Sequence, residues 1–200
     1  MRIIGITGQS GSGKGYLSCE LAKLGYIHLD ADAIYHGLLL SNGDMKSELV
    51  RAFGSDIEKD GQIDRRLLGL RVFGKGNQRK LLRLNKITHK YVCREYIKHI
   101  ISYRAQGAKG IIIDAPLLIE ARLDKLCDIN VFVTASREVR INRIMERDKI
   151  DRAAAERRID SQKGDLFYAR HCSEVFLNNG EESAADYALY IDKLLDGGSK

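Results

Sequence analysis

Residues 2–16 read Arg-Ile-Ile-Gly-Ile-Thr-Gly-Gln-Ser-Gly-Ser-Gly-Lys-Gly-Tyr, an apolar run that passes directly into a glycine-rich turn. The turn matches the pattern G-x-x-x-x-G-K, with Lys14 as its lysine. Because glycine adopts positive φ readily, Gly8, Gly11 and Gly13 allow backbone N–H groups to converge on an anion. A helix beginning near Gly13 adds the positive end of its dipole, and Lys14 adds a mobile charge. The stretch therefore predicts a strand, a phosphate cradle and a helix, with a triphosphate as the natural ligand.

The residues after the lysine depart from this motif. Where the pattern has Ser or Thr to hold Mg²⁺, the chain has Gly15, followed by Tyr16. The departure weakens the argument for a metal contact but leaves the phosphate contacts of the loop, including those of Ser12, intact. Glycine-rich turns between a strand and a helix also occur for packing alone. Three glycines and a lysine at this spacing favour phosphate binding.

Composition sets the class of protein. The 200 residues are 44% hydrophobic and 30% charged, as expected of one globular domain with at most an inserted subdomain. A formal net charge of +6 points to an anionic partner, which the charge alone leaves open between nucleic acid, a nucleotide and a phosphorylated metabolite. The four cysteines lack zinc-ligand spacing and are expected to be buried thiols in a reducing cytoplasm. With no export signal and no apolar run of spanning length, a cytoplasmic protein without a membrane partner is expected.

The hydrophobic pattern predicts an α/β fold. A helical pattern follows the cradle, and a second short strand then ends at Asp30-Ala31-Asp32, which makes a βαβ unit with parallel strands. From Ala33 to Gly107 the pattern is almost wholly helical, with no strand signal, and indicates an insertion between sheet strands. Further strands are predicted at 111–114, 129–133 and 175–177, and further helices at 137–162 and 182–195.

Acidic residues follow two of the predicted strands, where parallel sheets place their ligands. Asp32 could accept the proton of an alcohol that attacks a γ-phosphate, and Asp30 could orient it or bind a metal-bound water. Both could instead cap a helix beginning at Ala33. Asp114 ends an apolar strand as the Mg²⁺-holding acid of P-loop proteins does, or it caps the turn into Pro116.

An arginine-rich helix is predicted after the fourth strand. Arg140, Arg143 and Arg147 fall on one face, at i, i+3 and i+7, beside an apolar face. Such a cluster could neutralise the charge that develops on a transferring phosphoryl group. The alternative is a solvated face of ion pairs with neighbouring carboxylates such as Glu138 and Asp148.

Taken together, these residues resemble the dephospho-coenzyme A kinase family, whose members phosphorylate the ribose 3′-hydroxyl of dephospho-coenzyme A with ATP. The resemblance runs over nearly the whole chain. It rests on the cradle, the Leu-Asp-Ala-Asp element, Leu84-Asn85 with His89, Asp114-Ala-Pro-Leu-Leu-Ile-Glu120, Arg143 with Arg147-Asp148, Arg158-Ile159 with Gln162, and Asn178-Asn179-Gly180. The cradle is shared by many NTPases, whereas the Asp-Ala-Asp, Pro-Leu-Leu-x-Glu and Asn-Asn-Gly elements in this order are far more restrictive.

The resemblance implies a P-loop kinase core with a five-stranded parallel sheet, a helical acceptor-binding domain and a helical lid. The core is expected at 1–33, 108–135 and 163–200, the acceptor domain at 34–107 and the lid at 136–162. The resemblance casts Asp32 as general base, with Lys14, Arg143 and Arg147 as phosphate ligands. It places Asn179 near adenine, and it assigns to the acceptor site His89, Leu117, Leu118 and Glu120. ATP with Mg²⁺ and dephospho-coenzyme A are the implied ligands.

Three other functions compete with this one. A kinase with a phosphate acceptor is disfavoured because Asp32 would repel that acceptor. A nucleic-acid-binding ATPase should interleave basic and aromatic residues, but aromatics are only 7% of the chain, so no nucleic-acid partner is expected. A protein that binds nucleotide without catalysis is suggested by Gly15 and Tyr16.

Overall fold

The computed structural model describes residues 1–74 and 76–197, which divide into two compact units. The core unit comprises Met1–Asp30 and Tyr103–Lys200, and the helical unit comprises Ala31–Ser102. The predicted boundaries of the acceptor domain, 34–107, and of the lid, 136–162, are functional assignments and stay predictions. The predicted α/β class with a five-stranded parallel sheet is confirmed.

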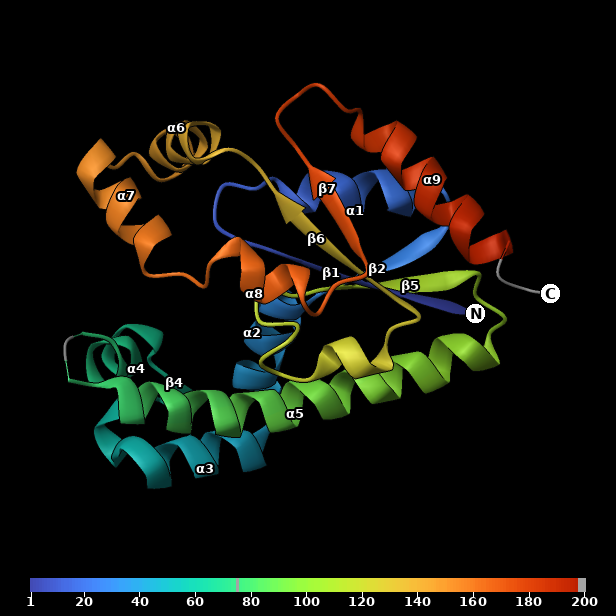
Figure 1. Cartoon of the computed structure of the whole chain (residues 1–200). Helices are drawn as coiled ribbons and strands as arrows, with labels where there is room; N and C mark the ends of the chain where they lie inside the picture. Colours follow the sequence, from blue (N-terminus) through green and yellow to red (C-terminus); the bar gives the residue numbers. More distant parts are fainter. Residues whose placement is uncertain (75, 198–200) are drawn as a thin grey trace. The chain divides into compact units, whose positions relative to one another are not determined.

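The sheet of the core unit has the strand order β2-β5-β1-β6-β7, and all four pairings are parallel (Figure 1). Its strands are β1 Arg2–Gly8, β2 Tyr26–Asp30, β5 Gly110–Asp114, β6 Ile129–Thr134 and β7 Glu174–Leu177. The first strand lies at the centre, so the loop that follows it opens at the middle of the sheet's carboxyl edge.

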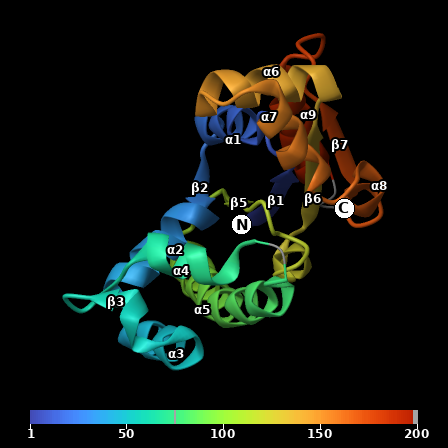
Figure 2. The ribbon, with the colours of Figure 1, turned by 90° about the vertical axis from the view of Figure 1, so that its left-hand side faces the viewer.

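One face of this sheet is covered by α1 (Lys14–Lys23) and α9 (Ala184–Gly197), which pack against each other (Figures 1 and 2). Alternate strand residues face these helices because side chains of a strand alternate between its two sides. The shared core of this face contains Ile4, Ile6, Leu17, Leu21, Ile112, Val131, Val133, Phe176, Tyr187, Ala188 and Ile191. The glycine-rich loop is thus anchored at both ends, by a central strand and by a packed helix.

The opposite face of the sheet includes an aromatic contact. Phe132 of β6 stacks on Tyr168 of α8 (Asp165–Ala169), with ring centroids 4.7 Å apart. The fully buried Leu118 lies beneath Gly5, where an added Cβ would come within 2.9 Å of it. A short 3₁₀ helix at Leu123–Leu126 then leads into β6.

The arginine-rich segment forms two helices, α6 (Arg137–Asp148) and α7 (Arg152–Asp160). They are joined at Lys149, which adopts the left-handed conformation at φ 54°, and Asp151 caps α7 by accepting a 2.7 Å hydrogen bond from the Ala154 N–H. Apolar residues of both helices form their own small core, with Ile141, Ile144, Ala155 and Ile159.

The helical unit contains α2 Ala31–Ser41, α3 Gly43–Phe53, a 3₁₀ turn at Ser55–Ile57, α4 Arg65–Val72 and most of α5 Gln78–Ala105. The prediction that no strand interrupts this stretch is wrong. Two short antiparallel strands, β3 (Glu58–Lys59) and β4 (Gln62–Ile63), form a hairpin. Its turn needs two residues of positive φ, and Asp60 (49°) and Gly61 (73°) supply them.

The cysteines are all free, and the prediction that they are buried is wrong for Cys19, which is exposed on α1. The other three are half-buried; burial, chiefly, raises the pKa of the Cys172 thiol to about 12. Over residues 1–74 and 76–197, no helix combines the length and apolar character that crossing a membrane requires.

Candidate functional site

The glycine-rich loop has the conformation that an anion cradle requires, with one correction. Gly11 and Gly13 have φ of 79° and 85°, which only glycine adopts without strain. Gly8 ends β1 without a positive φ. Glycine is required there because a Cβ would come within 2.5 Å of the Val133 carbonyl oxygen and 2.7 Å of the Ser12 Oγ. Gly8 therefore allows the loop to approach β6 closely, and Gly11 and Gly13 allow the positive φ angles that bend the backbone around an anion.

The loop is held from outside by its carbonyl groups. Arg143 of α6 donates from Nη1 to the carbonyls of Gly11 and Ser12, both at 3.3 Å, and the amide of Asn178 donates to Ser12 at 2.9 Å. In a trans peptide the N–H of the next residue points opposite to the carbonyl. Anchoring the Ser12 carbonyl outward therefore turns the Gly13 N–H inward, where it can donate to a phosphate.

Arg140 has a different role from the one expected. Its side chain is buried, donating to the Ser10 carbonyl at 3.0 Å and to the Gln162 Oε1 at 3.1 Å. Burial lowers the pKa of its guanidinium. The same Gln162 oxygen accepts from the Ser10 N–H at 3.1 Å. Arg140 therefore supports the loop through these hydrogen bonds. Helical spacing alone could not distinguish its role from that of Arg143.

Asp114 lies at the end of β5 and is the centre of a polar cluster. It is 2% exposed and forms an ion pair with Lys14 through Oδ1. Its other oxygen accepts a 2.7 Å hydrogen bond from Ser18 and lies 3.1 Å from the His28 Nε2. Asp114 is therefore bound to the lysine of the loop, rather than serving mainly as a cap for the turn into Pro116.

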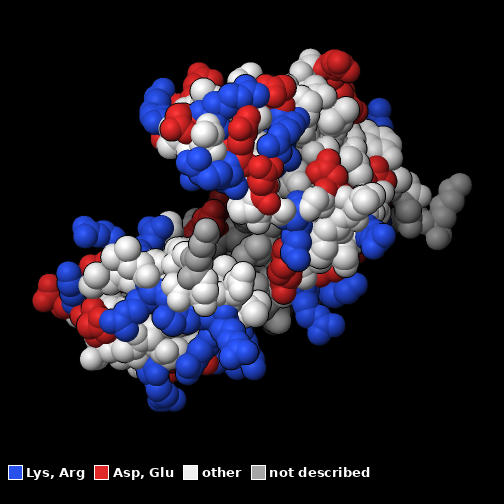
Figure 3. All heavy atoms as spheres, turned by 60° about the vertical axis from the view of Figure 1, so that its left-hand side comes forward, with Lys and Arg blue, Asp and Glu red and all other residues white. Residues whose placement is uncertain are grey.

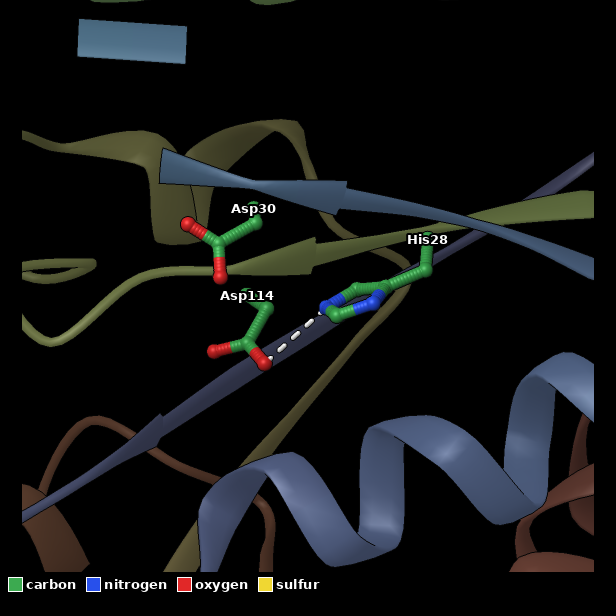
Figure 4. Close-up of side chains that lie close together, drawn as sticks. All are labelled: His28, Asp30 and Asp114. Carbon is green, nitrogen blue, oxygen red and sulfur yellow. Dashed lines mark hydrogen bonds and ion pairs between the residues drawn. The ribbon is translucent and has the colours of Figure 1, made fainter. Parts of the chain in front are cut away.

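His28, Asp30 and Asp114 come from the neighbouring strands β2 and β5, and their ligand atoms all lie within 4.8 Å of one another. Figure 4 shows the imidazole and the two carboxylates converging at the ends of these strands. Burial, opposed by Asp30 and reinforced by Lys14, lowers the pKa of the His28 imidazole. His28 and Ser18 were not predicted, because nothing in the local sequence pattern joins them to Asp114.

Arg147 of α6 and Arg158 of α7 are engaged in ion pairs. Arg147 binds Asp148 through two hydrogen bonds, of 2.8 and 3.0 Å, and Arg158 pairs with the same carboxylate. Figure 3 shows basic and acidic side chains interleaved over these helices. Arg147 is exposed, whereas Arg143 is half-buried against the loop.

The remaining residues expected around the nucleotide are placed as follows. The Asn179 Oδ1 accepts a 2.8 Å hydrogen bond from the Ser136 N–H, which ties the end of β7 to the end of β6. Gly15 and Tyr16 lie in the first turn of α1, and both are exposed. A Cβ added at Gly15 would meet no described atom within 4 Å. The fold therefore has room for a hydroxyl-bearing side chain at this position and does not require glycine there.

The segment after β5 contains two leucines, of which one is exposed and the other buried. Leu117 is 41% exposed, whereas Leu118 is 0% exposed. Direct contact of Leu118 with an acceptor does not fit this burial, because it has no surface to offer. Glu120 is half-buried, and its Oε2 has no hydrogen-bond partner among the described residues.

Two expected residues belong to the helical unit. Asp32 is exposed and is the second residue of α2, which begins at Ala31. The alternative in which Asp32 caps a helix starting at Ala33 is therefore wrong. His89 is half-buried in α5, and burial lowers the pKa of its imidazole.

The chain is similar to known proteins over most of its length. The family model described as dephospho-CoA kinase matches residues 2–184. A dephospho-CoA kinase of Dehalococcoides mccartyi is 37% identical, covering 90% of this chain and 89% of its own. One of Carboxydothermus hydrogenoformans is 40% identical over 80% of this chain and 77% of its own. A crystal structure of a Thermus thermophilus protein covers 100% of this chain and 98% of its own, with a TM-score of 0.79 and 27% identity.

Proposed function

This chain belongs to the dephospho-CoA kinase family, and we propose that it performs the family's reaction with Asp32 as general base and Lys14, Arg143 and Arg147 as phosphate ligands. The reaction moves the γ-phosphoryl group of ATP to the ribose 3′-hydroxyl of dephospho-coenzyme A. The products are coenzyme A and ADP, so this is the last step of coenzyme A biosynthesis. We assign the reaction to the cytoplasm.

The glycine-rich loop binds the phosphates of ATP. The outward anchoring of its carbonyls by Arg143 and Asn178 is the observation that carries this assignment, because it prepares the inward N–H groups before any ligand arrives. Lys14 contacts the terminal phosphates, leaving its ion pair with Asp114 to do so. Gly15 and Tyr16 flank the phosphates, and Asn179 lies beside adenine.

Asp32 accepts the proton of the acceptor hydroxyl. Its exposed position in the first turn of α2 leaves the carboxylate accessible to a ligand. An alcohol needs such a base, because its proton must leave as the bond to phosphorus forms. A phosphate acceptor needs none.

The acceptor is bound by His89, Leu117 and Glu120, with Leu118 supporting the segment from beneath. Leu117 offers an exposed apolar surface, and the Glu120 Oε2 is a buried acceptor without a described partner. The helical unit adds positive charge for the anionic groups of dephospho-coenzyme A.

The metal contact is assigned to Asp114. Its carboxylate is a hard oxygen donor at a strand end, next to Lys14, and so fits a divalent ion beside bound phosphates. Charge neutralisation at the β- and γ-phosphates is what Mg²⁺ supplies when it is bound. The chain's own part is to hold Asp114 in place, which Ser18 does through its 2.7 Å hydrogen bond.

The decisive experiment measures ADP production with dephospho-coenzyme A against a panel of nucleoside monophosphates. Turnover is expected with dephospho-coenzyme A as acceptor and with none of the monophosphates. Preference for a monophosphate would replace the proposed acceptor. A protein that binds DNA or RNA near physiological salt and produces no ADP would be a nucleic-acid-binding ATPase instead.

A further inference from the structure

The carboxyl ends of β2 and β5 bring together ligand types that suit a transition metal. In the parallel register Asp30 is paired with Asp114, and His28 with Ile112. His28 therefore lies one pleat back on the same strand as Asp30, and Figure 4 shows its ring directed at the Asp114 carboxylate. One imidazole with two carboxylates is a donor set between those of Mg²⁺, which prefers oxygen, and Zn²⁺, which accepts nitrogen readily.

The distances fit a single ion. Two donor atoms that each lie about 2.1 Å from an ion, and 3.1 Å apart as the His28 Nε2 and Asp114 Oδ2 are, subtend about 95° at it. This is close to the right angle of octahedral coordination. Donors on opposite sides of such an ion are about 4.2 Å apart. The 4.8 Å limit for the whole group leaves only a small rotation of the carboxylates to complete the set.

The usual place for the ion lacks its ligand in this chain. The residue after the P-loop lysine should provide a hydroxyl, and here it is Gly15, although a side chain there would meet no described atom within 4 Å. We propose that this chain holds the divalent ion of its reaction with His28, Asp30 and Asp114, at the ends of β2 and β5, and that it uses Mn²⁺ in preference to Mg²⁺. The inference rests on the proposed kinase function and adds to it the identity and ligands of the metal.

Lys14 and the ion share Asp114. Without nucleotide, the ammonium group neutralises the Asp114 Oδ1. When phosphates draw Lys14 away, the buried Asp114 carboxylate loses the cation that neutralises it and then needs another. Nucleotide and metal should therefore bind with positive coupling, each increasing the affinity of the other by the same factor.

Ser18 fixes the geometry of this ligand set. Its hydroxyl is fully buried and donates to the Asp114 Oδ2 at 2.7 Å. An outer hydrogen bond of this kind orients a ligating carboxylate. Ser18 is one helical turn beyond Gly15, so α1 still contributes a hydroxyl, but to the ligand rather than to the ion.

The test measures binding of Mn²⁺ to the whole chain. Electron paramagnetic resonance detects it as a loss of the signal of free Mn²⁺. One ion per chain is expected, bound more tightly with ADP present. His28→Asn should weaken Mn²⁺ binding by about tenfold or more, the scale expected when a ligand shell is disturbed. His171→Asn is the matched control, because His171 is an exposed histidine whose ring bonds the carbonyl of Phe167, outside the Asp114 cluster. Equal Mn²⁺ affinity of wild type and His28→Asn would overturn the inference, as would absence of binding with and without ADP.

A second variant separates this inference from the kinase function. Gly15→Ser supplies the missing hydroxyl, and it should lower the Mg²⁺ concentration for half-maximal turnover much more in the His28→Asn background than in the wild type. Equal effects in both backgrounds would mean that the two positions serve different ions, and the inference would fail. Turnover of dephospho-coenzyme A in Mg²⁺ with no effect of His28→Asn would keep the proposed function and reject the metal site. Asp30→Asn repeats the binding test should His28→Asn fail to fold.

Discussion

The core unit and the helical unit carry positive charge in different ways. Residues 31–102 contain 14 Lys and Arg against 8 Asp and Glu, so the whole formal net charge of +6 lies in the helical unit. The rest of the chain has 19 of each and is neutral. The core unit instead offers backbone N–H groups, which are arranged by two glycines and by the side chains that anchor the loop carbonyls.

This difference has a general consequence. A cradle of backbone donors depends on conformation, so a single methyl group can destroy it. A field of lysines and arginines depends on the number of charges and is screened by salt. On α5 the exposed Arg79, Arg83, Lys86 and Lys90 recur at spacings of three and four residues, so they lie along one face. We therefore expect sharp effects of substitution in the core unit and graded ones in the helical unit.

The largest effect is expected at Asp32, which belongs to the helical unit but has a proposed chemical role. It is therefore an exception to the graded effects expected there. Asp32→Asn should lower kcat by about 10²- to 10⁴-fold, the range that a general base supplies, while ATP binding in the core unit is unchanged. Steady-state kinetics and calorimetric titration with ATP measure the two quantities. Asp44→Asn is the control, because Asp44 is also an exposed carboxylate in the first turn of a helix. Turnover that survives in Asp32→Asn would remove Asp32 as the base.

The next effect tests whether the units are separate in stability. Leu21 of α1 and Leu49 of α3 are both 0% exposed, and truncation of either to Ala should cost about 2–5 kcal/mol. Hydrogen exchange should show faster opening mainly in the unit that carries the substitution. If Leu49→Ala loosens β1 and α1 as much as its own unit, the chain unfolds as one cooperative body.

Two alanine substitutions in the loop sharpen the conformational argument. Gly13→Ala combines a φ of 85° with overlap against the Asn178 amide, so it should cost about 1–3 kcal/mol and most of the ATP affinity. Gly15→Ala lies in a helix with open space around it and should stabilise the protein by about 0.5–1 kcal/mol. Thermal unfolding and ATP titration measure both. Similar losses in the two variants would contradict the cradle geometry.

A smaller effect is expected from the charge of the helical unit. Arg83→Glu should raise the KM for dephospho-coenzyme A by about two- to fivefold at low salt, and the difference should shrink at high salt. The KM for ATP should stay unchanged. Arg157→Glu is the matched control, an exposed arginine of the core unit. An equal rise with Arg157→Glu would mean that net charge, rather than its location, matters.

The smallest effect concerns pH. Burial lowers the pKa of His89 from its ordinary 6.5, so the unfolded chain binds a proton that the folded chain does not. The contribution of His89 to stability is therefore complete above pH 6.5 and falls as the pH drops below it. His89→Gln should flatten the dependence of the free energy of unfolding on pH below 6.5, measured with urea at several pH values. An unchanged slope would assign the acid sensitivity to other groups.

Some features were not predictable because they depend on contacts between distant residues. Helical spacing put Arg140 and Arg143 on one face, but only packing showed that Arg140 is a buried brace while Arg143 lies against the loop. Likewise, the short hairpin at Glu58–Ile63 has too few residues for an alternating pattern, and its signal was the Asp-Gly pair in the turn.

The order of residues was enough to predict the α/β class, the phosphate cradle and the acidic residue after each of two strands. These follow from local rules, because hydrophobic periodicity, glycine and the residue next to it act over a few positions. The cluster of Lys14, Ser18, His28 and Asp114 was decided only by the tertiary structure. Its members come from α1, β2 and β5, and they meet because β5, about 80 residues later in the chain, inserts between β1 and β2 in the parallel sheet.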